Sequence, residues 1–114
     1  MKTIGLVLIF SAVLAIALAG NAKVSVGTIE GTVVDAHGQP VAGASVTIQT
    51  SDGQHPHATH TDASGHFQFA RFATGQYDLR AYFKGAYSDW DKRVPLSSHK
   101  PTEITLRIAS TSKP

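Results

Sequence analysis

Apolar and polar residues alternate through five segments of the chain, with an apolar or small side chain at every second position. These segments are residues 28–35, 44–50, 66–72, 76–84 and 102–108. A period of two is that of a β-strand with one buried face, whereas an amphipathic helix repeats every 3.6 residues. The pattern therefore predicts strands throughout this region and no helix.

Turn-forming residues separate the segments at intervals of about ten residues, the spacing of an all-β sandwich. The turns are Asp52-Gly53, Asp62–Gly65, Thr74-Gly75 and Lys84-Gly85. Over residues 28–108 we expect a seven-stranded antiparallel Greek-key β-sandwich.

The period of two also assigns each strand residue to a face. Asp78 and Arg80 are expected outside, and Pro95 at a strand end or in a loop, where its missing N–H does little harm. The expected core residues are Val33, Val46, Ile48, Phe67, Phe69, Leu79 and Leu106.

Residues 31–48 read as a strand, a tight turn and a second strand. Gly38 can take positive φ in the turn, and Pro40 fixes φ just after it. Further on, Asp62 and Gly65 fit a turn in which the Asp side chain bonds its own backbone, and Gly75 fits another. We expect these five residues to have structural roles, although Asp62 alone could also be a catalytic acid or a calcium ligand.

Three motifs in this region carry a resemblance to a known family. They are G-x-V-x-D-x-x-G-x-P-V-x-G-A-x-V-x-I at residues 31–48, T-D-A-S-G-H-F-Q-F at 61–69 and G-Q-Y-D-L at 75–79. In this order they resemble the carboxypeptidase regulatory-like domain, a transthyretin-like (prealbumin-like) β-sandwich. The resemblance covers roughly residues 28–108 and implies the fold. It implies little about function, because such domains are appended to many unrelated proteins.

The first residues have the composition of a secretory signal peptide. A basic start at Lys2 precedes an uncharged apolar run, residues 4–18, and small residues suit cleavage after Ala19 or Ala22. The run is shorter than the ~20 residues that a bilayer span needs. We therefore expect residues 1–22 to be removed, 23–27 to be a linker and 109–114 a flexible tail. The product is expected to be periplasmic or extracellular, without stable membrane insertion.

The charge argues against nucleic acid as a partner. Removing residues 1–22 takes away one lysine and no acid, so the formal charge of +2 falls to +1. Charges of both signs are scattered along the chain, as on an ordinary solvated surface. The chain has no cysteine, so packing alone must stabilise the exported domain.

Histidines are the candidates for a metal site. His55, His57 and His60 lie close together in sequence, and imidazole suits zinc, copper or nickel. On a strand, however, His57 and His60 would face opposite ways. We interpret them as surface residues and expect no bound metal and no cofactor.

Aromatic residues are the candidates for binding. Tyr82, Tyr87 and Trp90 could stack on sugar rings or form a protein contact, although Trp90 shares parity with Val94 and could instead cover an edge of the core. Residues 87–93 carry charges of both signs and have the marks of an edge strand, to which a partner strand could add.

Two enzyme interpretations fail on the residues. The 5-hydroxyisourate hydrolases share this fold and resemble the first motif, but the position of their catalytic histidine is Thr32 here. Their C-terminal Tyr-Arg-Gly-Ser is also absent. A zinc carboxypeptidase would need H-x-x-E, which does not occur.

We therefore expect a non-catalytic exported β-sandwich with a structural or protein-interaction role. Its expected partner is an envelope protein or a glycan. The alternative is a carbohydrate-binding module, and a transthyretin-like hydrolase is a distant third.

Overall fold

A computed structural model describes residues 24–109, which form eight strands and no helix. The strands are β1 (Val26–Val34), β2 (Ser45–Thr50), β3 (His57–His60), β4 (His66–Ala73), β5 (Gly75–Phe83), β6 (Ala86–Tyr87), β7 (Asp91–Leu96) and β8 (Thr102–Arg107). The expected signal peptide and the last five residues of the expected tail lie outside the described residues.

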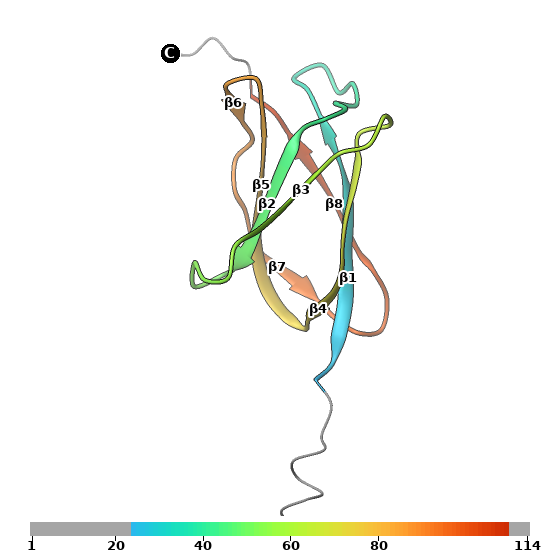
Figure 1. Ribbon diagram of the computed structural model, residues 1–114, viewed down its shortest axis with the longest axis vertical. Coiled ribbons are helices and arrows are strands. Elements are labelled where there is room, and N and C mark those ends of the chain that lie inside the picture. Colours follow the sequence, from blue (N-terminus) through green and yellow to red (C-terminus); the bar gives the residue numbers. More distant parts are fainter. Residues whose placement is uncertain (1–23, 110–114) are drawn as a thin grey trace, which may run out of the picture.

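The strands form two sheets packed face to face (Figure 1). One sheet has three strands in the order β4-β1-β8. The other has five, in the order β3-β2-β5-β6, with β7 also paired to β5. The predicted all-β sandwich is therefore confirmed.

The core lies between the sheets and is made by the alternating inward side chains. Ile29, Ile48 and Leu79 are among its fully buried members. All seven residues expected in the core belong to it, which confirms the assignment of faces from the period of two. Gly31 lets β1 approach β8 and Phe67 closely, since a Cβ there would lie 2.2 Å from the Ile104 carbonyl oxygen.

Two details of the sheets differ from the expectation. Eight strands are present rather than seven, because Ser88 to Trp90 interrupt the strand that follows β5 and divide it into β6 and β7. Pairing is antiparallel except between β1 and β8, which run parallel. No hairpin joins these two strands, so no tight turn dictates their direction.

The first strand starts earlier than expected. Val26 pairs with Ala73, and the Ser25 carbonyl accepts the Thr74 N–H, so the segment assigned to a linker begins β1. Pro95 was expected at a strand end or in a loop, but it lies within β7 opposite Gln76. This position suits proline because β7 is an outer strand of its sheet.

Asp78 is another exception, since it was expected outside and is only 9% exposed. Its carboxylate accepts the Arg93 N–H at 3.0 Å and the Ser51 hydroxyl at 3.0 Å. The pairing of β5 with β7 shifts by one residue here, and Arg93 has a φ of 56°. The Asp78 carboxylate thus accepts a backbone N–H group of a β-bulge in β7. Alternation of apolar and polar residues does not predict such a bulge.

The same aspartate turn occurs twice in the chain. Asp35 Oδ1 accepts the N–H groups of His37 and Gln39, and Asp62 Oδ1 accepts those of Ser64 and His66. In both turns the glycine at the fourth position has positive φ, 85° at Gly38 and 80° at Gly65.

The two turns also pack against each other. A Cβ on Gly65 would lie 2.9 Å from Cβ of Pro40, and the Gly65 carbonyl accepts the Val33 N–H. The two motifs thus position the ends of β1 and β4. Gly75, the first residue of β5, has a φ of 151°.

Candidate functional site

The outer face of the five-stranded sheet carries a cluster of aromatic residues around an arginine. Arg80 and Tyr82 point outward from β5, because Leu79 and Ala81 point into the core. The two-residue turn Lys84-Gly85 has positive φ at both residues, as a type I′ hairpin requires. This turn places Tyr87 of β6 directly opposite Tyr82.

These side chains contact one another. The Tyr82 and Tyr87 ring centroids are 4.8 Å apart, and Cζ of Arg80 lies 4.1 Å from the Tyr87 ring centroid. The same Cζ lies 4.5 Å from the Trp90 ring centroid. We call Arg80, Tyr82, Tyr87 and Trp90 the arginine–aromatic patch.

Trp90 belongs to this patch because the backbone before it is displaced from regular pairing. The Ser88 N–H donates to the Ala81 carbonyl, and Ser88 Oγ accepts the Ala81 N–H at 2.8 Å. The register with β5 shifts by one residue between Tyr87 and Asp91 and by one more between Asp91 and Val94. The second shift lies between Trp90 and Val94, so these two residues do not share a face, and half-buried Trp90 lies against Arg80.

The patch combines exposed aromatic area with a fixed cation. Tyr82 and Tyr87 are 40% and 49% exposed, which makes them two of the four exposed large hydrophobic residues of the described chain. A guanidinium held by ring faces keeps its N–H groups in the plane free to donate. Tyrosine, tryptophan and arginine are also the residues that dominate binding energy at protein interfaces.

Strand addition next to the patch is obstructed. Ile108 forms a bridge with Ser88, and the Ala109 N–H donates to the Tyr87 carbonyl. At the other end of the same side, the Thr102 hydroxyl donates to the Pro95 carbonyl at 2.7 Å. Residues 87–93 thus belong to outer strands of their sheet, but residues 108–109 cover this edge at Tyr87 and Ser88.

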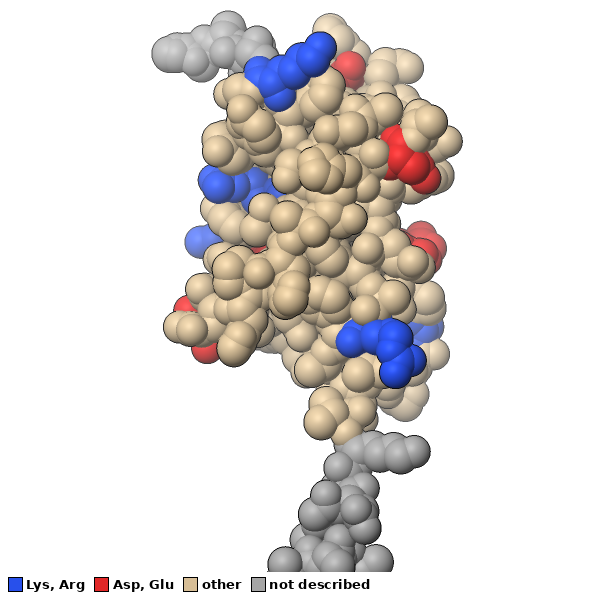
Figure 2. All heavy atoms as spheres, in the orientation of Figure 1, with Lys and Arg blue, Asp and Glu red and all other residues tan. Residues whose placement is uncertain are grey.

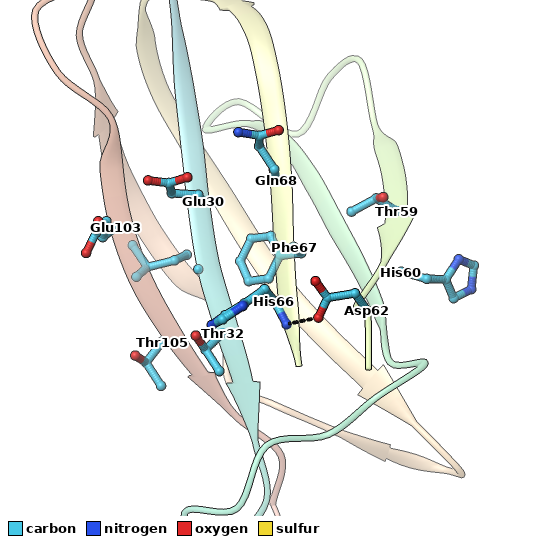
Figure 3. A pocket seen from close by; sticks show the side chains of 12 residues that line it. Glu30, Thr32, Thr59, His60, Asp62, His66, Phe67, Gln68, Glu103 and Thr105 are labelled. Atoms are coloured by element: carbon cyan, nitrogen blue, oxygen red, sulfur yellow. Dashed lines mark hydrogen bonds between the residues drawn. The ribbon is translucent and has the colours of Figure 1, made fainter. Parts of the chain in front are cut away.

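A second candidate site is a hollow of about 780 Å³ over the outer face of the three-stranded sheet (Figure 3). Gln68, Glu30 and Glu103 lie side by side across β4, β1 and β8. Asp62 also lines the hollow, whereas Phe67 and Ile104, which the lining strands place between the outward residues, have their side chains in or against the core. Among its twelve lining residues there are three carboxylates and no lysine or arginine.

The histidines do not come together. His55 lies in the loop before β3, and the His57 ring packs edge-on against Phe72 with centroids 5.2 Å apart. His60 points away from the other labelled side chains of the hollow (Figure 3). Within residues 24–109 no three histidine, cysteine or acidic side chains are placed to hold a metal ion.

Three aspartates have a lowered pKa, and in each case the cause is local hydrogen bonding. The His66 N–H, followed by the Ser64 N–H, lowers the pKa of Asp62, and the Gln39 N–H lowers that of Asp35. For Asp52 the largest cause is the Thr50 hydroxyl. A carboxylate held in its charged form by backbone N–H groups is a turn element and a poor proton donor at neutral pH.

The sequence interpretation named three members of the patch but missed Arg80. The signal was available, because Arg80 and Tyr82 are two residues apart on one strand and so share a face. Elsewhere, charges of both signs lie around the margins of the face shown in Figure 2, without a large patch of one sign. No helix able to cross a membrane is found among residues 24–109.

Comparison with known proteins identifies the fold. The carboxypeptidase regulatory-like domain matches residues 28–109, as the three motifs predict. None of the curated proteins matches the chain in sequence.

Among solved structures, the chain is similar to GBS52, the minor pilin of Streptococcus agalactiae, with a TM-score of 0.67 and 19% identity. The match covers 80% of this chain and 47% of GBS52, so the chain spans about half the length of that pilin.

Two further similar structures belong to other functional classes. Catechol 1,2-dioxygenase from Pseudomonas arvilla has a TM-score of 0.58 and 14% identity, covering 83% of this chain and 55% of the enzyme. A candidate carbohydrate-binding protein from Pseudomonas aeruginosa has a TM-score of 0.52 and 15% identity. That match covers 79% of this chain and 93% of the Pseudomonas aeruginosa protein. The shared fold therefore does not decide the function.

Proposed function

Because the chain belongs to the carboxypeptidase regulatory-like domain family, we propose that it is a non-catalytic exported module that binds another protein. The arginine–aromatic patch is the binding surface in this proposal. The leader-like composition of residues 1–22 and the likeness to a pilin support an exported location.

One observation carries the proposal, namely that the Arg80 guanidinium lies over the rings of both Tyr87 and Trp90. This contact fixes three large side chains before a partner arrives, which lowers the entropy lost on binding. A buried contact of tyrosine, tryptophan and arginine is the usual centre of a protein interface.

The same contact makes a glycan the weaker candidate. Stacking of a sugar needs an open aromatic face, and Arg80 already covers one face of Tyr87 and one of Trp90. Tyr82 is exposed but lies only 4.8 Å from Tyr87, at an interplanar angle of 47°. A carbohydrate-binding function remains the second candidate because both tyrosines are exposed and a similar structure belongs to that class.

A non-catalytic role agrees with the chemistry of the two surfaces. Position 32, where the resembling hydrolases have a catalytic histidine, is a threonine on β1. Asp62, which could have been an acid catalyst, is engaged with the backbone of its own turn.

The experiment compares two kinds of ligand on one set of variants. The protein, expressed with all 114 residues, is immobilised and exposed to cell-envelope extract and, separately, to a glycan array. The variants are the double substitution Tyr82→Ala/Tyr87→Ala and the single substitution Arg80→Gln. The control, Gln54→Ala/Gln76→Ala, removes two exposed side chains outside the patch.

We expect a retained envelope protein that is lost with both patch variants and kept with the control, and no retained glycan. Glycan retention that the double variant abolishes would favour the carbohydrate-binding function instead. Retention that survives both patch variants would show that the patch is not the binding surface.

A further inference from the structure

The outer face of the five-stranded sheet has a step beside the arginine–aromatic patch. On β2, Thr47 is the partner of Arg80 and Ser45 is the partner of Tyr82. Paired residues point to the same face, so these small hydroxyl side chains lie directly beside the large ones of β5. Beyond them, β3 places Ala58 opposite Thr47. A chain segment can therefore lie on β2 and β3 with one side against the patch.

This side of the patch offers a cation and an apolar surface. The Arg80 guanidinium is planar, and its N–H groups are arranged to meet the two oxygens of a carboxylate. The acid closest to it along the strand is Asp78. Its Oδ1 already accepts the Arg93 N–H and the Ser51 hydroxyl. Tyr82, which is 40% exposed, provides the apolar surface. The complement is a carboxylate from outside the chain together with an apolar side chain.

The distance between these two groups determines the form of the ligand. Arg80 and Tyr82 are two residues apart on one strand, which places their Cα atoms about 6.8 Å apart. In an extended segment, side chains two residues apart also lie on one side, at the same spacing. A segment that runs along the step meets both groups if it carries an acidic residue and a large apolar residue two positions apart.

We propose that the patch binds an extended segment of a partner protein in which an acidic and a large apolar residue stand two positions apart. The carboxylate meets the Arg80 guanidinium, and the apolar side chain packs on Tyr82. This inference rests on the proposed function, because it names the chemistry of the protein that the patch binds. An acidic glycan brings the charge without the apolar side chain, and Arg80 already lies over the ring faces of Tyr87 and Trp90.

Trp90 provides the readout, because it is the one tryptophan of the chain and its ring centroid lies 4.5 Å from Cζ of Arg80. A carboxylate that reaches the guanidinium changes the charge beside the indole and hence its fluorescence. The probe is the blocked peptide acetyl-Ser-Glu-Ser-Phe-Ser-amide, titrated into the millimolar range. A second peptide has glutamine in place of glutamate. A third, acetyl-Ser-Glu-Phe-Ser-Ser-amide, has the same composition with the two residues adjacent. Trigalacturonate serves as the acidic glycan.

The variants remove or alter the cation. They are Arg80→Gln and Arg80→Lys, and far-UV circular dichroism verifies that each is folded. The matched control is Lys100→Gln, which removes one positive charge at an exposed residue outside the patch. Arg80→Lys keeps the charge without the planar fork, so it tests the geometry even if Arg80→Gln does not fold.

The glutamate peptide should change the fluorescence of the wild type and of the control, and the change should saturate. Glutamine in place of the peptide's glutamate, or of Arg80 in the protein, should weaken binding about ten- to a hundredfold, because a charged hydrogen-bonded pair is lost. Arg80→Lys should bind with an intermediate affinity. The peptide with adjacent residues should also bind more weakly, since its two side chains point to opposite sides. Added salt should weaken binding.

Several results would overturn the inference. One is a glutamate peptide that leaves the wild-type fluorescence unchanged or binds no better than the other two peptides. Another is unchanged binding by both Arg80 variants. A response to trigalacturonate alone would assign the patch to an acidic glycan. The first two outcomes leave the proposed function standing if the immobilised wild type still retains an envelope protein that the tyrosine double variant loses.

Discussion

Replacing Phe69 by alanine tests whether the inward face of β4 supports the sandwich as described. Phe69 is 5% exposed, pairs in register with Ile29, and lies with its ring centroid 5.5 Å from that of Phe72 and 6.0 Å from that of Phe67. Truncation of a buried phenylalanine to alanine costs about 3–5 kcal/mol, because the transfer energy is lost and a cavity remains.

That loss is a large share of the total stability of a small domain, which is about 5–15 kcal/mol. Since 1 kcal/mol shifts the melting temperature of a domain this size by roughly 4–8 °C, the variant should melt at least about 12 °C lower. The assay is thermal and urea unfolding followed by far-UV circular dichroism. If Phe69→Ala does not fold, Phe69→Leu should show a smaller loss in the same direction.

The neighbouring residue provides the control. Gln68 precedes Phe69 on the same strand and is exposed, so Gln68→Ala should change the stability by no more than about 0.5 kcal/mol. If Phe69→Ala melts within a degree or two of the wild type, or if Gln68→Ala costs as much, the assignment of faces on β4 is wrong.

Two further predictions concern backbone features. Gly31→Ala should lower the free energy of unfolding, measured in urea, by about 1–3 kcal/mol, because the new methyl group meets the Ile104 carbonyl and the Phe67 ring. Thr32→Ala is the control, and an equal effect of both substitutions would refute the close approach of the strands at Gly31. Asp62 has a pKa below its usual value of 3.8, so its contribution to stability is present above that value and is lost as the pH falls through the folded-state pKa. Asp62→Asn should therefore melt below the wild type at neutral pH, with a gap that narrows between about pH 5 and pH 2; a constant gap would mean that the carboxylate charge is not what the turn uses.

The core could be predicted from the sequence because a strand with regular pairing keeps its period of two. Val33, Ile48 and Leu79 lie in regular stretches of the ladders of β1 with β8 and of β2 with β5, and each is where alternation places it. Prediction failed where β6 and β7 pair irregularly with β5. At Trp90 a one-residue shift exchanges the two faces, and at Asp78 the bulge of β7 supplies an N–H group that the outward carboxylate binds.

The candidate site could be predicted only in part, for a related reason. Tyr82 and Tyr87 pair across a two-residue turn, which the Lys84-Gly85 pair predicts. Their proximity therefore follows from a short stretch of sequence. The hollow is different, because Glu30 and Glu103 are brought together by the parallel pairing of the first and last strands. No short-range pattern indicates that contact, and the acidic row was not foreseen.

The patch lies within residues 80–90, yet its geometry depends on the end of the chain. Ile108 and Ala109 leave the three-stranded sheet and bond to the segment at Tyr87 and Ser88. This contact covers an edge that would otherwise be open to aggregation, and it also fixes the backbone from which Tyr87 projects. Edge protection and presentation of the binding surface are thus produced by the same few hydrogen bonds, so a change at residues 108–109 should weaken binding as well as stability.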